Sequence, residues 1–146
     1  MARRSPELLI DLFTAKGVVT FTELQDALGS ASRATTFRYL KRVKYLRSYN
    51  YNGCYYTHRD PALFDRFGLY SLGDIHFSRD ATLGDTLRRL VRESQAGCTQ
   101  RELQELLRVR VQVLLLAAVR HDEIGREKVA GFYLYLHSDP AIGPVS

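Results

Sequence analysis

Basic side chains gather in one short stretch of this 146-residue sequence. Residues 1–59 contain ten Lys or Arg against four acidic residues, and seven of the ten fall between Arg33 and Arg59. Residues 60–146 contain eleven basic and twelve acidic residues, so the net charge of +5 arises in the first part of the chain. A solvated helix face is the simple explanation of scattered charge, but clustering in one segment favours a surface that binds nucleic-acid phosphates.

One side of a helix over residues 33–45 has the residue types that read a base pair. At 100° per residue, Thr35, Arg38 and Arg42 fall on one side, and the opposite side is apolar and suited to a core. Arginine binds guanine through O6 and N7, and threonine contacts a base edge or a thymine methyl group. An ordinary exposed basic helix would have a similar composition, but the ordered stripe leads us to expect contact with DNA.

Further side chains near this stripe are placed to hold the sugar–phosphate backbone. Lys41, Lys44 and Arg47 can bind phosphate without reading sequence. Asn52 lies at the tip of an expected hairpin, where its amide can reach phosphate or sugar; a plain turn is the alternative. The two arginines near the N-terminus would suit a minor-groove arm, although a frayed terminus is the commoner case. The DNA-binding residues predicted on these grounds are Arg33, Thr35, Arg38, Tyr39, Lys41, Arg42, Lys44, Arg47 and Asn52.

An internal repeat divides the sequence. ELQDAL at residues 23–28 returns as ELQELL at residues 102–107, 79 residues later. The similarity continues, in order and spacing, to an aromatic strand that follows Gly53 in the first copy and Gly131 in the second. One deletion, which we place in the turn before the third helix, aligns the two copies over about 36 residues.

Each copy is expected to contain a helix, a short strand, a second helix, a turn, a third helix and a hairpin, in that order. In the first copy, Thr22 should cap the second helix, and Ser32 should cap a third helix that continues to about Tyr45. Asn52-Gly53 is the strongest two-residue hairpin signal in the chain.

The second copy carries clearer helix starts. Thr82 and Thr99 each stand three residues before an acidic residue, so each should begin a helix with a capping box. The third helix should span about residues 110–120, and Ala130-Gly131 should turn the hairpin.

This order of elements resembles a tandem pair of winged helix-turn-helix domains over residues 5–58 and 81–137. The resemblance is carried by TELQDALGSASRATTFRYLKRV with YNYNGCYYT, and by QRELQELLRVRVQVLLLAAV with KVAGFYLYL. It implies a mainly α fold with small β-hairpin wings (α+β), whose third helix enters the major groove while the wing lies along the backbone or minor groove. The expected organisation is a winged helix at 1–59, an ordered connector at 60–80, a second winged helix at 81–138 and a tail at 139–146.

The third helix of the second copy is predicted to contact protein rather than DNA. The alignment pairs Thr35 with Val113 and Arg38 with Leu116, so the reading face of the first copy is largely apolar in the second. A helix that is apolar almost all round should be buried on more than one side. We expect this helix to pack against a partner or against the first unit, most simply as a homodimer interface formed by the Val113 and Leu116 face; the alternative is a helix deep in the core of its own unit.

The connector at residues 60–80 is too apolar for a flexible linker. Gly73-Asp74 is suited to closing a small hairpin within it. We therefore expect the connector to be ordered and to fix the two units against one another. The connector residues expected to be buried are Leu63, Phe64, Phe67, Leu69, Tyr70, Ile75 and Phe77.

No sequence motif supports catalysis. Phosphate-binding loops, nucleophile elbows, metalloprotease motifs and kinase motifs are all absent. The two cysteines, Cys54 and Cys98, form no disulfide framework, and with His58 and His76 they lack the paired spacing of a zinc site. We expect no enzyme activity, no cofactor and no metal. The longest apolar run, residues 113–119, is far shorter than the ~20 residues that cross a bilayer.

The sequence thus predicts a cytoplasmic, nucleoid-associated protein that binds double-stranded DNA sequence-specifically and regulates transcription as a dimer. One alternative is a DNA-targeting component of a mobile-element or genome-defence assembly whose catalytic part is another chain. The other is a winged-helix module that binds protein. DNA binding that weakens steeply with salt is expected for the first two and not for the third.

Overall fold

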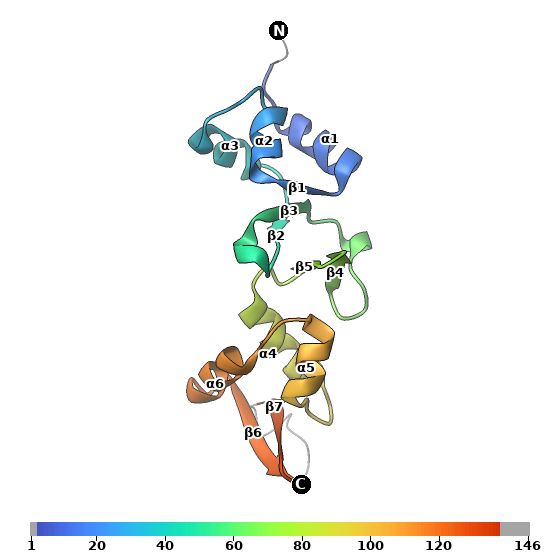
Figure 1. The fold of residues 1–146 in the computed structure, drawn as a ribbon, viewed down its shortest axis with the longest axis vertical. Coiled ribbons are helices and arrows are strands. Elements are labelled where there is room, and N and C mark those ends of the chain that lie inside the picture. Colours follow the sequence, from blue (N-terminus) through green and yellow to red (C-terminus); the bar gives the residue numbers. More distant parts are fainter. Residues whose placement is uncertain (1–2, 138–146) are drawn as a thin grey trace. The chain divides into compact units, whose positions relative to one another are not determined.

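A computed structural model describes residues 3–137 and divides the chain into two compact units, Met1–Ala81 and Thr82–Ser146 (Figure 1). The described residues form six α-helices and seven β-strands, and every strand pair is antiparallel. The mixed α+β class expected from the sequence is therefore confirmed. No helix within residues 3–137 has both the length and the apolar character needed to cross a membrane.

The first unit places three helices against a three-stranded sheet whose strand order is β1-β3-β2. A second, two-stranded sheet, β4-β5, follows in the same unit. Its elements are α1 (Pro6–Lys16), β1 (Val18–Thr20), α2 (Phe21–Ala27), α3 (Arg33–Leu40), β2 (Tyr45–Arg47), β3 (Tyr55–His58), β4 (Leu69–Leu72) and β5 (Ile75–Ser78).

The start of α2 is set by Thr20, and the prediction that Thr22 caps this helix is wrong. The Thr20 hydroxyl accepts a hydrogen bond from the Glu23 N–H at 3.3 Å, and the Glu23 carboxylate accepts one from the Thr20 N–H at 3.0 Å. This reciprocal pair requires a glutamate or glutamine three residues after the cap. Thr20 has Glu23 at that spacing, so β1 passes into α2 without a loop.

The helix α3 begins where Ser32 was predicted to cap it, with the Ser32 hydroxyl accepting from the Thr35 N–H at 3.2 Å. It ends at Leu40, so the prediction that it continues to Tyr45 is wrong. Val43 turns back into the core, where only 5% of it is exposed, and Tyr45 already pairs with His58 in the sheet. The helix therefore ends at Leu40 because Val43 packs in the core and Tyr45 belongs to β2.

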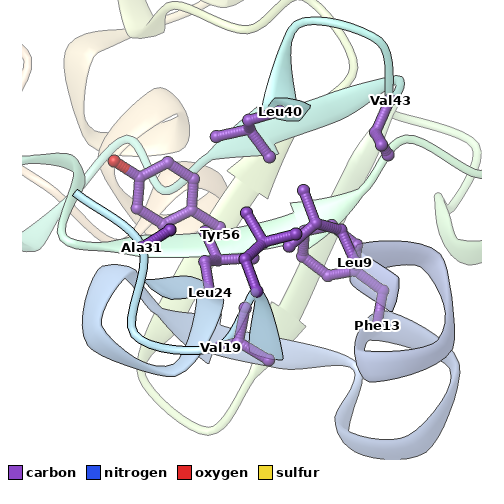
Figure 2. Packing of buried hydrophobic residues seen from close by; sticks show 9 residues of the cluster. Leu9, Phe13, Val19, Leu24, Ala31, Leu40, Val43 and Tyr56 are labelled. Carbon is purple, nitrogen blue, oxygen red and sulfur yellow. The ribbon is translucent and has the colours of Figure 1, made fainter. Parts of the chain in front are cut away.

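The hydrophobic core of the first unit joins all three helices to β1 and β3 (Figure 2). Leu9, Leu24 and Leu40 are completely buried, from α1, α2 and α3 respectively. Each buried leucine contributes about 1.5–3 kcal/mol relative to exposure, so this core holds α3 in place. The core cluster comprises Leu9, Phe13, Val19, Leu24, Leu28, Ala31, Leu40, Val43 and Tyr56.

The loop between β2 and β3 is longer than the predicted two-residue turn at Asn52-Gly53, so that prediction is wrong. Register pairing ends at Arg47 and Tyr56, and one further bond joins the Ser48 N–H to the Tyr55 carbonyl at 2.9 Å. A 3-10 turn over Tyr51–Gly53 fills the loop. Side-chain hydrogen bonds from this loop to the β4-β5 hairpin set its shape. Turn propensities describe neighbouring residues only, so they do not predict these bonds.

The connector folds onto the first unit. Leu72 pairs with Ile75, which confirms the predicted hairpin turn at Gly73-Asp74. The Tyr49 N–H donates to the His76 carbonyl at 2.9 Å and ties this hairpin to the loop after β2. Leu69 and Phe77 are buried as expected, whereas Leu63 is 37% exposed, contrary to expectation. Phe64, Phe67, Tyr70 and Ile75 are half-buried.

The second unit repeats the order of three helices and a hairpin, but the short strand expected before its second helix is reduced to a single bridge residue, Cys98. The two predicted helix starts are confirmed, and Thr99 forms a complete capping box with Glu102. The capping box predicted at Thr82 is incomplete: the Thr82 hydroxyl accepts from the Asp85 N–H and donates to the Asp85 carboxylate. The predicted hairpin turn at Ala130-Gly131 is also confirmed, since Val129 pairs with Phe132. The elements are α4 (Leu83–Glu93), α5 (Gln100–Leu107), α6 (Gln112–Arg120), β6 (Ile124–Val129) and β7 (Phe132–His137).

The backbone pairings of the two units correspond at a constant spacing of 79 residues. Val19 pairs with Tyr56 in the first unit, and Cys98 forms a bridge with Tyr135 in the second. The capping boxes begin at Thr20 and Thr99, again 79 apart. The internal repeat read from the sequence is thus a repeat of topology.

The deletion assumed in the sequence alignment is not present. The helices α3 and α6 begin at residues 33 and 112, and the pair Arg47 and Tyr56 corresponds to Arg126 and Tyr135. The segments between these equivalent pairs are equally long, but strand pairing in the second wing continues to a two-residue turn, and the aligned glycines differ by one position from the 79-residue spacing. Thr35 and Arg38 therefore correspond to Leu114 and Ala117, and the projection onto Val113 and Leu116 is wrong.

Candidate nucleic-acid interface

The turn between α2 and α3 fixes the direction in which α3 presents its surface. The Gln25 carbonyl accepts from the Ala31 N–H at 3.1 Å, and the Gln25 side-chain amide donates to the Ala31 carbonyl at 3.2 Å. Thr36 and Leu40 then face inward and are fully buried, while Arg38 is exposed. Neither the hydrogen bonds of Gln25 in this turn nor the burial of Thr36 was predicted from the sequence.

Arg38 and Arg42 converge on the ring of Tyr39. Their guanidinium carbons lie 5.6 and 5.8 Å from the ring centre. Tyr39 is half-buried and packs against the core cluster, so the ring is a fixed platform for two exposed cations. Cation–π contacts of this kind contribute about 0.5–1 kcal/mol at exposed sites. The structure brings these three predicted residues together although Arg42 lies beyond the end of α3.

Arg33 and Thr35 lie at the first turn of α3. The Arg33 guanidinium carbon is 5.5 Å from the centre of the Phe21 ring and 5.2 Å from that of Phe37. The Thr35 hydroxyl accepts from the Ser32 hydroxyl at 3.0 Å and keeps its own O–H for donation. Both side chains therefore remain able to bind a ligand from fixed positions.

The remaining predicted cations differ in their freedom. Lys41 and Lys44 are exposed in the turn that follows α3. Arg47 is bound to its own wing: its Nε donates to the Gly53 carbonyl at 2.9 Å and its guanidinium lies 5.3 Å from the Tyr56 ring centre. Lys41 and Lys44 are thus better placed than Arg47 to meet a phosphate.

The first wing is tied to the β4-β5 hairpin. The Asn50 amide donates to the Asp74 carbonyl at 2.7 Å and accepts from the His76 N–H at 3.0 Å. The Tyr51 hydroxyl donates to the Asp74 carboxylate; this bond holds the pKa of Asp74 below its usual range and raises the pKa of Tyr51. Asn52 stays exposed in a left-handed conformation at the tip.

The sequence around α3 contains no acidic residue to neutralise its cations. Asp and Glu are absent between Asp26 and Asp60. An ion pair at α2 joins Lys16 to Glu23, and the Lys16 ammonium lowers the pKa of that carboxyl. The face made by Arg33, Arg38, Lys41, Arg42 and Lys44, which we call the α3 face, therefore keeps its positive charge.

Arg4 does not extend from the unit as a free arm. Its Nε donates to the Leu28 carbonyl at 2.8 Å and satisfies the C-terminal end of α2. Arg4 and Leu28 are 24 positions apart, so their contact could not be predicted from the sequence.

The third helix of the second unit exposes the apolar residues Val113 and Leu116, which correspond to Ala34 and Phe37 of the first unit and not to its cations. Leu115 and Ala118 are buried in its own core, whereas Val113 is 79% exposed and Leu116 is 37% exposed. The alternative of a helix wholly inside its own unit is therefore wrong. The hairpin β6-β7 adds Val129, Phe132 and Tyr133 to the exposed large hydrophobic residues of this unit.

Within residues 3–137, no group of three or more His, Cys, Asp and Glu side chains is placed to hold a metal ion. Both cysteines are free, and burial raises the pKa of the Cys98 thiol. Comparisons with family models, with curated proteins and with solved structures returned no significant match to this chain.

Proposed function

We propose that this chain binds double-stranded DNA in a sequence-specific manner through the α3 face of its first unit. The observation that carries the proposal is the pair of guanidinium groups held on the Tyr39 ring, within residues 27–59, a stretch of sequence that contains no Asp or Glu. Such a surface both attracts phosphate and offers bidentate donors to guanine.

The dimensions of α3 suit the major groove. An α-helix with its side chains is about 10–12 Å in diameter, which fits the width of about 12 Å of the groove, and the 8 residues of α3 extend over about 12 Å. Arg38 is assigned to a base edge because it lies on the helix itself. Arg42, Lys41 and Lys44 follow the helix and are assigned to the backbone, which positions the protein without reading sequence.

Both units are proposed to be winged helices. In each, three helices are followed by a hairpin, and the residues between the first two helices pair with the last strand: β1 with β3 in the first unit, and Cys98 with Tyr135 of β7 in the second. The first wing has limited reach toward DNA, since Asn50 and Tyr51 are bound to Asp74. Asn52 is the wing residue assigned to the backbone.

The second unit is proposed to join two copies of the chain. Val113 and Leu116 expose apolar surface on α6, and contiguous exposed apolar patches mark interaction sites. A symmetric dimer would place two α3 faces on two half-sites, and occupancy of such a site would regulate transcription. A role for this apolar surface in binding a different protein is the second candidate function.

Selection from a randomised duplex library tests the proposal. The wild-type chain should enrich a motif, and the double variant Arg38→Ala with Arg42→Ala should lose that enrichment. Arg66→Ala with Arg92→Ala removes the same charge from exposed positions outside the α3 face and should retain the motif. An absence of DNA binding by the wild-type chain would overturn the proposal and favour the protein-binding candidate.

A further inference from the structure

A separate hollow lies directly beyond the α3 face in the first unit. It has a volume of about 360 Å³ and is lined by Val43, Lys44, Tyr45 and Arg59. Two of its four lining residues are cations and none is acidic. Arg59 was not among the residues predicted to bind DNA.

Backbone contacts hold the two cations at the same end of the sheet. The Arg59 N–H donates to the Lys44 carbonyl at 2.8 Å, directly beside the Tyr45 and His58 pair of the ladder. The Arg59 guanidinium also donates to the Arg79 carbonyl at 2.7 Å. This bond uses one of five guanidinium N–H groups and orients the remainder.

The charge of this hollow distinguishes it from its neighbour. An adjacent hollow of about 400 Å³ shares Arg59 but is also lined by Asp65 and Asp80. The Asp65 carboxylate accepts N–H groups of Phe67 and Leu69 and stays fixed in that second hollow. An anion is therefore favoured on the side of Lys44.

We infer that the hollow between Lys44 and Arg59 binds a phosphate of the DNA backbone, next to the stretch contacted by the α3 face. The inference rests on the proposed function and adds Arg59 to the DNA-binding residues. Arginine offers a planar fork that matches phosphate geometry, and lysine supplies a compact point charge. Because Lys44 belongs both to the α3 face and to this hollow, the two sites form one continuous track.

The test measures DNA affinity of the full chain between about 50 and 200 mM salt, the range over which phosphate contacts have large effects. Arg59→Gln should reduce the salt slope by about 0.9, the value for one phosphate, while sequence preference stays unchanged. Arg59→Lys should restore most of the slope. Arg66→Gln, which removes an exposed charge outside the hollow, is the matched control and should leave the slope unchanged.

A second arm locates the phosphate. Duplexes in which one phosphate at a time is replaced by an uncharged methylphosphonate should reveal one position outside the base-contact region that weakens wild-type binding. Arg59→Gln should be insensitive to that replacement. Thermal unfolding of each variant, followed by circular dichroism, checks that the fold is retained.

Three results would overturn the inference, and they are distinguishable. Equal salt slopes for Arg59→Gln and Arg66→Gln would show that the hollow takes no DNA phosphate. Failure of the wild-type chain to bind any duplex would overturn the proposed function as well. Tripolyphosphate that shifts the Arg59 side-chain NMR signal without competing with duplex would assign the hollow to a free phosphorylated ligand.

Discussion

The guanidinium carbon of Arg42 lies 5.8 Å from the centre of the Tyr39 ring, although α3 ends two residues before Arg42. The Arg42 N–H also donates to the Tyr39 carbonyl at 3.0 Å, so backbone and side chain both fix this residue. Although α3 does not extend to Arg42, contacts with Tyr39 keep Arg42 beside Arg38. The aromatic ring is a positioning group for the cations of the α3 face.

Replacing the Tyr39 ring should weaken DNA binding without unfolding the unit. Tyr39→Leu removes two cation–π contacts of about 0.5–1 kcal/mol each that hold the cations in place before binding, so affinity should fall, with about 5- to 30-fold as the upper limit. Tyr39→Phe keeps the ring and is the matched control, with affinity expected within about twofold of wild type. Fluorescence anisotropy with a labelled duplex measures both. Equal affinities for the two variants would contradict the positioning role.

The start of α2 gives a stability prediction. Thr20→Ala removes the capping box and should cost about 0.5–2 kcal/mol, while Thr22→Ala on the exposed first turn should change stability by less than about 0.5 kcal/mol. Urea unfolding followed by circular dichroism measures the loss, and hydrogen exchange of α2 amides assigns it to the first unit. A larger cost for Thr22→Ala would show that the helix starts two residues later.

The bond between Tyr51 and Asp74 gives a pH prediction. The folded pKa of Asp74 lies below its ordinary value of 3.8, so this contact is fully present above that value and is lost as the pH falls through the folded pKa. Tyr51→Phe should raise the pKa of Asp74 toward 3.8. Carboxyl-carbon NMR titration measures the change, and an unchanged Asp74 titration would contradict the contact.

The apolar surface of α6 gives a prediction about assembly. Val113→Asp with Leu116→Asp places charge on the exposed face and should convert the proposed dimer to a monomer in sedimentation-velocity experiments. Gln112→Asp adds charge at the exposed first residue of the same helix, where an acidic residue is favourable, and should leave the dimer intact. A wild-type chain that sediments as a monomer at all concentrations would contradict self-association through α6.

Several local signals in the sequence predicted local structure correctly, although the cap at Thr22 and the two-residue turn at Asn52-Gly53 were wrong. Ser32, Thr82 and Thr99 begin helices as expected, and Gly73-Asp74 closes a hairpin, because each feature depends on residues within four positions. The type of fold followed from these signals and from the repeat.

Features that depend on distant residues could not be predicted in the same way. The end of α3 is set by the packing of Val43 and the pairing of Tyr45, and the first wing is shaped by its bonds to Asp74. Arg59 reaches the end of the α3 face only through the β2-β3 ladder. The sequence identified the basic segment, but the structure was needed to show which of its cations share a surface.

The central claim is tested most directly by NMR titration of the full chain with a selected duplex. The account predicts that backbone amides of Arg33–Leu40 and the side-chain Nε–Hε signals of Arg38 and Arg42 shift the most, and that a scrambled duplex of equal length and salt produces smaller shifts. Shifts confined to Gln112–Arg120, or no shifts with any duplex, would contradict recognition of DNA by α3.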